Sequence, residues 1–96
     1  MPTEQERIAV SMASFADWII KVKGIQRDVK PGHLCIGPIQ KTDEFHIVQK
    51  TGREDYTIHR IDQLCDTLPL PGVGQSVQIK YDVEGRGVVL NTGRYL

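Results

Sequence analysis

Turn-forming residues divide the chain between Gly32 and Leu90 into short runs of alternating apolar and polar residues. The interruptions fall at Gly37-Pro38, Thr51-Gly52-Arg53, Pro71-Gly72-Val73-Gly74 and Glu84-Gly85-Arg86-Gly87. Glycine and proline at such short intervals disrupt helices, whereas they are common in the turns that join short strands. This region therefore predicts a small β-barrel.

Five runs in this region are candidate strands. They lie near residues 34–36, 45–49, 56–59, 77–81 and 87–90, and residues 60–64 are expected to form a single helical turn. The glycine-rich turn between the last two runs predicts a hairpin. Strands about ten residues apart are typical of a closed or nearly closed antiparallel sheet. We therefore expect an α+β fold, mainly β, with an SH3-like barrel of about five strands over residues 32–92.

The residues before Gly24 predict an amphipathic helix over residues 3–23. Thr3 and Glu6 have the spacing of a capping box, in which each side chain bonds the backbone N–H of the other residue. Apolar side chains recur three and four residues apart at Ile8, Met12, Phe15, Ile19 and Val22. This stripe is expected to cover one end or edge of the barrel. A helix that stays undocked would instead bind a partner or form a homodimer.

Length and charge limit the classes of protein to which the chain can belong. Its 96 residues are enough for one domain. Twelve basic and twelve acidic residues cancel, which removes the general attraction to phosphate backbones that nucleic-acid binders have. The sequence shows no targeting segment and no apolar run near the roughly 20 residues of a membrane span. We expect a cytoplasmic protein of one domain, residues 1–96.

The sequence offers no recognisable catalytic or metal-binding arrangement. Its acidic residues are scattered, and no Ser-His-Asp set can be nominated. His33 and Cys35, with His46 or Cys65, are weak zinc candidates because structural zinc sites take four ligands from closely spaced pairs. Both cysteines are expected to be free thiols. We expect no enzyme, no metal and no cofactor.

Polar residues on both sides of the 51–55 turn form the first candidate binding surface: Gln49, Lys50, Arg53, His59 and Arg60. In a hairpin these residues would lie close together, where an amide, a guanidinium and an imidazole suit a phosphate or an acidic side chain. Trp18 would extend this surface. In the alternative interpretation, Gln49 and His59 bond backbone groups of the barrel while nearby acidic residues neutralise the arginines.

A second basic run consists of Lys21, Lys23, Arg27 and Lys30. Together with Trp18 it could follow a nucleic-acid backbone, with the indole available for stacking. Asp28 interrupts the run, and four charges without a wider positive field bind weakly and in a salt-sensitive way. A solvated connector is the alternative.

One series of residues resembles a known family. The series comprises Gly32, Gly37-Pro38-Ile39, His46-Ile47-Val48-Gln49-Lys50, Gly52-Arg53, Ile58-His59-Arg60, Leu64 and Gly74-Gln75-Ser76-Val77-Gln78-Ile79-Lys80-Tyr81. It resembles the KfrB-like domain, found on plasmids, integrative elements and phages. The resemblance covers residues 32–90, leaves the N-terminal helix unexplained, and is interrupted by an insertion at 68–71.

The resemblance implies a noncatalytic module that acts in plasmid-maintenance or DNA-transfer complexes through protein, nucleic acid or both. Our first hypothesis is an adaptor that binds a protein of a plasmid-maintenance, conjugation or phage nucleoprotein complex. A second is an anti-CRISPR-like inhibitor that docks on a host nuclease complex. A third is a DNA-binding regulator that uses residues 21–30.

Overall fold

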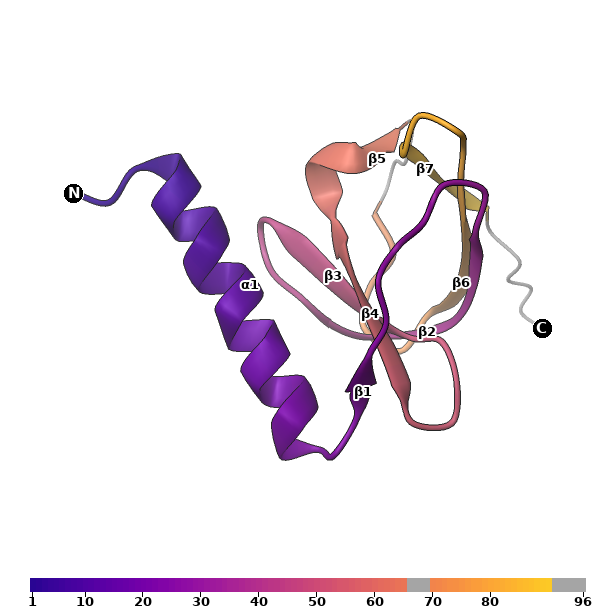
Figure 1. Cartoon of the computed structure of the whole chain (residues 1–96), viewed down its shortest axis with the longest axis horizontal. Coiled ribbons are helices and arrows are strands. Elements are labelled where there is room, and N and C mark those ends of the chain that lie inside the picture. The colour runs from indigo at the N-terminus through magenta and orange to yellow at the C-terminus, as the bar shows by residue number, and fades with distance from the viewer. Residues whose placement is uncertain (66–69, 91–96) are drawn as a thin grey trace.

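A helix lies against one side of a strongly bent sheet in the computed structural model, which describes residues 1–65 and 70–90 (Figure 1). The elements in chain order are α1 (Glu4–Lys21), β1 (Ile25–Gln26), β2 (Leu34–Thr42), β3 (His46–Lys50), β4 (Asp55–Arg60), the 3-10 helix η1 (Ile61–Gln63), β5 (Leu64–Cys65), β6 (Ser76–Tyr81) and β7 (Gly87–Leu90). The strands lie in the order β1-β4-β3-β2-β6-β7-β5.

The predicted capping box is present at the start of α1. The Thr3 N–H donates to Glu6 Oε1 at 2.7 Å, and the Glu6 N–H donates to Thr3 Oγ1 at 3.1 Å. The buried face of α1 contains Ser11, Phe15 and Ile19, so it follows the predicted stripe in its middle part. The stripe does not continue to the end of the helix, because α1 ends at Lys21 and the following residue is exposed.

Gly24 allows the chain to turn tightly from the helix into β1. A Cβ atom at this position would lie 2.4 Å from two ring carbons of Tyr56, which is itself buried against α1. We expect Gly24→Ala to lower the free energy of unfolding by about 1–3 kcal/mol, because the packed ring cannot move aside freely. Urea denaturation measures this loss. An unchanged midpoint would contradict it, and Gly72→Ala, where the added carbon has open space, is the control.

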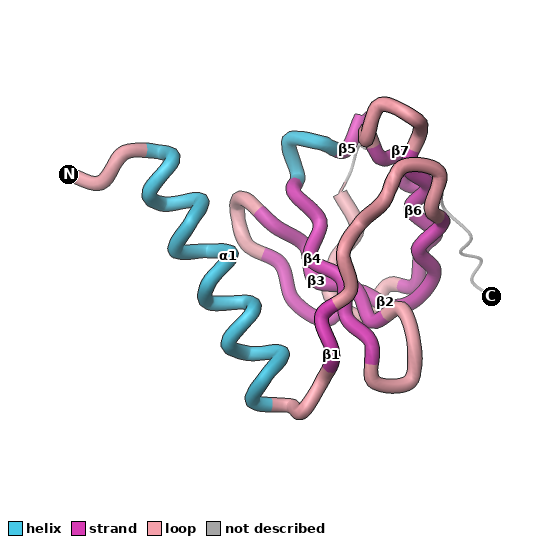
Figure 2. The backbone as a smooth tube through the Cα atoms, viewed as in Figure 1, coloured by secondary structure: helices cyan, strands magenta, loops and turns pink. Residues whose placement is uncertain are grey.

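Strand β2 is shared by the two halves of the sheet. Its first five residues pair with β6, and its last residues pair with β3 across an irregularity between Ile39 and Lys41. Gly37 lies at the change of partner with φ 151°, and a Cβ atom there would come 1.8 Å from the Lys50 carbonyl oxygen. The irregularity expected at Gly37-Pro38 therefore lies slightly later, between Ile39 and Lys41, while both residues keep their regular pairing with β6. Figure 2 shows the strands curled around an interior.

The coarse expectation of an α+β fold, mainly β, is confirmed, but the SH3-like barrel of about five antiparallel strands, closed or nearly closed, is not, because the sheet is open. Seven strands are described, β1 and β5 end the sheet without pairing with each other, and both pair in parallel, with β4 and β7. These two-residue strands are too short to leave an alternating pattern in the sequence. The end of the expected 32–92 module and half of the 68–71 insertion lie outside the described residues.

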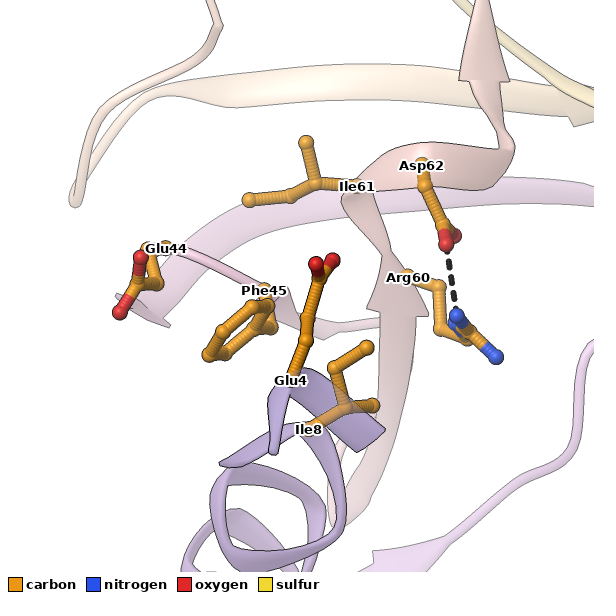
Figure 3. A pocket seen from close by; sticks show the side chains of 7 residues that line it. All are labelled: Glu4, Ile8, Glu44, Phe45, Arg60, Ile61 and Asp62. Atoms are coloured by element: carbon orange, nitrogen blue, oxygen red, sulfur yellow. Dashed lines mark hydrogen bonds and ion pairs between the residues drawn. The ribbon is translucent and has the colours of Figure 1, made fainter. Parts of the chain in front are cut away.

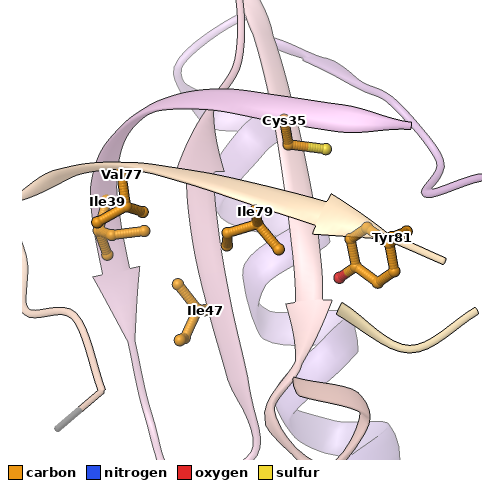
Figure 4. Close-up of a cluster of buried hydrophobic side chains, with 6 residues drawn as sticks. All are labelled: Cys35, Ile39, Ile47, Val77, Ile79 and Tyr81. Atoms are coloured by element: carbon orange, nitrogen blue, oxygen red, sulfur yellow. The ribbon is translucent and has the colours of Figure 1, made fainter. Parts of the chain in front are cut away.

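Apolar side chains fill two clusters, one on each face of β3 and β4. The cluster inside the bend contains Cys35, Ile39, Ile47, Val77, Ile79 and Tyr81 (Figure 4). The cluster under the helix contains Phe15, Ile19, Val48, Tyr56 and Ile58. Burial of each large side chain contributes roughly 1.5–3 kcal/mol, so the second cluster holds α1 on the sheet. The helix is therefore docked on the sheet, but it covers a face of β3 and β4 instead of the expected end or edge of a barrel.

Candidate functional site

Two of the five residues expected at the hairpin surface belong to a buried network. The Gln49 amide donates to the carbonyl oxygens of Gly37 and Val77 at 3.0 and 2.9 Å. Its oxygen lies 2.9 Å from His59 Nε2, and His59 Nδ1 lies 2.6 Å from the Tyr81 hydroxyl. Gln49 and His59 are 0% exposed. The expected contact role of these two residues is therefore corrected: a carbonyl group of β2 and one of β6 bond the Gln49 amide inside the sheet.

The same hydrogen bonds determine which nitrogen of His59 carries the proton. The Gln49 oxygen accepts, so His59 carries its proton on Nε2 and accepts from the Tyr81 hydroxyl at Nδ1. Burial lowers the pKa of His59 to about 4 and raises that of Tyr81 above its usual range. Both groups are neutral at pH 7. The network joins β2, β3, β4 and β6 without a buried charge.

A second polar cluster, absent from the sequence-based candidates, connects the helix to the sheet. Ser11 Oγ lies 2.5 Å from Asp43 Oδ2 and 2.7 Å from His46 Nδ1. Asp43 also accepts the N–H groups of Phe45 and His46. Burial alone would raise the Asp43 pKa, but these hydrogen bonds outweigh it and lower the pKa. Burial lowers the pKa of His46. The only sequence signal for this cluster is a serine on the apolar stripe, four residues before Phe15.

The directions of these hydrogen bonds differ from those in a Ser-His-Asp catalytic triad. Ser11 donates its proton to the Asp43 carboxylate, so it accepts from His46 Nδ1 and is not deprotonated by the imidazole. His46 Nε2 is buried and has no hydrogen-bond partner in residues 1–65 and 70–90. The cluster holds α1 on the loop between β2 and β3.

The basic residues of the expected surface lie at opposite ends of β4. Lys50 pairs with Tyr56 at the start of the strand, and Arg53 lies in the preceding turn. Arg60 pairs with His46 at the other end and makes an ion pair with Asp62 at 2.6 Å. The structure therefore does not gather the five predicted residues into one cluster.

Lys50 belongs to a different group, which we call the lysine–aromatic patch: Trp18, Lys41, Lys50 and Tyr56. The Trp18 and Tyr56 rings meet edge to face with their centroids 5.4 Å apart. Lys41 Nζ lies 5.4 Å from the Trp18 centroid, and Lys50 Nζ lies 5.9 Å from that of Tyr56. Trp18, which was expected to extend the hairpin surface, is half-buried. The patch joins α1 to β2, β3 and β4.

The cations of this region are not neutralised by ion pairs. Neither lysine of the patch has an ion pair among the residues that the structure describes, and Arg53 in the neighbouring turn has none either. The other arginines in the same ranges all pair with carboxylates: Arg7, Arg27, Arg60 and Arg86. The patch is therefore the place where positive charge remains available to a ligand beside aromatic rings.

The second basic run is also divided. Lys21 ends α1, and Lys23 follows it with φ 61°. Arg27 makes an ion pair with Asp55 at 3.2 Å, and it lines with Lys30 an open groove of about 600 Å³. All four side chains are exposed, but one of the charges is already compensated.

The candidate zinc ligands differ in burial and in hydrogen bonding. His33 is exposed, whereas Cys35 is buried, and burial raises the pKa of its thiol. His46 is held by Ser11, and the Cys65 side chain lies outside the described part of the structure. In the described ranges no three His, Cys, Asp or Glu side chains are grouped to hold a metal ion. No helix there is long and apolar enough to cross a membrane.

The fold and these contacts define a small module of one helix on a bent sheet, with polar networks in its interior and a basic patch beside aromatic rings on its surface. The family model of the KfrB domain matches residues 35–91, from the second residue of β2 to just beyond β7. Because the match covers more than half of the chain, the chain belongs to the KfrB domain family. The predicted resemblance is confirmed. No curated protein and no solved structure matches the chain.

Proposed function

We propose that this chain is a noncatalytic binding module that docks an acidic segment of a protein partner on the lysine–aromatic patch. The partner belongs to a nucleoprotein complex of a plasmid, integrative element or phage. Membership of the KfrB family supports this setting. The observation that carries the proposal is the pair of lysines held over aromatic rings with no carboxylate partner within the described ranges.

The rings make the two lysines better ligands than free surface lysines. A lysine over an aromatic face gains cation–π attraction, and its alkyl stem packs on the ring. Its side chain then loses less conformational freedom when a carboxylate binds, so less of the interaction energy is spent on ordering. Trp18 and Tyr56 are themselves packed against each other. The patch is therefore preorganised for carboxylates.

A protein ligand fits the patch better than a nucleic acid. The chain carries no net charge, so it lacks the long-range field that concentrates phosphate backbones. Base stacking needs an open aromatic face. Here Lys41 lies over Trp18, and Tyr56 is only 8% exposed. Carboxylates can reach the lysines without moving either ring.

The buried side chains of Ser11 and His59 form hydrogen bonds with other groups of the chain, which supports the proposal that the module is noncatalytic. Ser11 donates to a carboxylate, and the two nitrogens of His59 are both engaged inside the sheet. General acid–base chemistry needs a group within reach of a substrate proton. His59 is completely buried and does not meet that condition.

Charge reversal of the patch tests the proposal. We expect Lys41→Glu with Lys50→Glu to abolish capture of the protein partner from a plasmid-bearing host in nuclease-treated lysate. The matched control is Lys23→Glu with Lys30→Glu, which makes the same charge change at exposed lysines outside the patch. Thermal unfolding checks that both variants are folded. Equal loss in the two variants, or a wild-type interaction that disappears with nuclease, would contradict the proposal.

A further inference from the structure

Three segments enclose a pocket on the side of the molecule that carries Arg60 (Figure 3). The first turns of α1 contribute Glu4 and Ile8, and the loop before β3 contributes Glu44 and Phe45. The end of β4 and η1 contribute Arg60, Ile61 and Asp62. None of these residues belongs to the lysine–aromatic patch, so an inference drawn from this pocket does not depend on the proposed function.

The pocket has the size of one long side chain and apolar walls. Its volume is about 190 Å³. This is roughly the liquid volume of six water molecules, and it is smaller than the ~300 Å³ at which sites for whole small molecules begin. Ile8, Phe45 and Ile61 supply the apolar walls, and all three are half-buried. An extended alkyl chain would contact these walls along its length.

One carboxylate of the pocket is uncompensated. Asp62 is paired with Arg60 and Glu44 with Arg7. Glu4 has no ion pair or hydrogen bond from its carboxylate to any other described residue. In Figure 3 its carboxylate extends into the space between the side chains of Phe45 and Ile61. The pocket therefore presents one negative charge among apolar walls.

The Phe45 ring already interacts with a cation of the chain itself. The Arg7 guanidinium carbon lies 5.3 Å from the ring centroid. Arg7 lines the neighbouring groove but not this pocket, whereas Phe45 lines both. Arg7 is therefore not among the residues that line the pocket, and a cation inside the pocket would approach the Phe45 ring as well as Glu4.

We infer that this pocket binds a lysine side chain of a partner protein. The alkyl chain lies against Ile8, Phe45 and Ile61, and the ammonium group meets the Glu4 carboxylate. A lysine side chain combines the length, the apolar stem and the single positive charge that the pocket complements. A divalent cation fits less well, because it requires six or more oxygen ligands and the other two carboxylates are engaged by arginines.

The test uses the amide of Nα-acetyl-lysine as the probe, with its neutral Nε-acetylated form as the comparison. The probe is titrated into the 15N-labelled chain while the amide resonances of Phe45 and Ile61 are followed. We expect saturable shifts with the charged probe only. Glu4→Gln, which keeps the shape and removes the charge, should weaken binding by about three- to fivefold, in the upper part of the range of one exposed ion pair.

The matched control is Glu54→Gln, an exposed glutamate in the turn between β3 and β4, which should leave binding unchanged. Thermal unfolding of both variants confirms that the fold is intact. The inference is overturned if the shifts do not saturate, if the neutral probe binds equally well, or if Glu4→Gln binds like the wild type. Because the patch variants with reversed Lys41 and Lys50 should bind the probe normally, failure here and failure of the proposed function are distinguishable.

Discussion

Gln49→Leu is expected to lower the free energy of unfolding by about 3 kcal/mol or more, because each buried polar group left without a partner costs about 1–3 kcal/mol. Leucine fills a similar volume but removes both the NH2 donor and the oxygen acceptor of the amide. The carbonyl groups of Gly37 and Val77 lose their donor, and His59 Nε2 loses its acceptor. A loss of this size is a large share of the stability of a small domain.

Urea denaturation measures this effect, with the slope of the transition used to check that the unfolded state is unchanged. The control is Gln63→Leu, the same replacement at an exposed glutamine of η1, which should change stability by less than about 0.5 kcal/mol. A loss below about 1 kcal/mol for Gln49→Leu, near the worth of a single ordinary hydrogen bond, would mean that the network is not continuous.

Acidification from pH 7 to pH 4 is expected to remove about 3 kcal/mol of stability through His59 alone. Its pKa is 6.5 in an ordinary environment and about 4 in the folded chain, because burial disfavours the charged imidazole. The unfolded chain therefore takes up the proton first, and stability falls as the pH drops from 6.5 towards 4. Burial also lowers the pKa of His46, which adds to the loss in the same direction.

Unfolding measured at several pH values tests this expectation. His33→Asn alters an exposed imidazole and should keep the full dependence on pH. His59→Gln should flatten the curve between pH 6.5 and 4, whatever its effect on absolute stability. Asp43, whose hydrogen bonds outweigh burial and lower its pKa, contributes only near and below its usual 3.8. A wild-type stability that stays constant across this interval would contradict a buried, neutral His59.

The features that were predicted correctly from the sequence depend on neighbouring residues. The capping box is a contact between Thr3 and Glu6, and the hairpin of β6 and β7 is specified by its own turn and alternating pattern. Gly37, which has a φ of 151°, lies close to the point where β2 changes partner, as the residue type suggests. Each of these signals lies within a few residues of the structure that it produces.

The features that were missed depend on contacts between distant segments. The irregularity after Ile39 turns Lys41 to the side of the sheet that α1 covers, and no local pattern shows on which face a residue after a bulge lies. Gln49 was a surface candidate because it flanks the 51–55 turn, and only its contact with the Gly37 carbonyl, twelve residues earlier, decides for the alternative in which it bonds backbone groups. The contact of Ser11 with Asp43 spans 32 residues.

Because β2 pairs with both β3 and β6, a cut in the chain after β2 would separate this strand from all of its partner strands. A cut in the loop between β2 and β3 would leave α1, β1 and β2 in one fragment, while every strand that pairs with β1 or β2 would remain in the other. The amino-terminal fragment would then contain no strand pair, and its helix would lose the apolar surface beneath it. The sheet would form again only when the two fragments bind each other, as in fragment complementation.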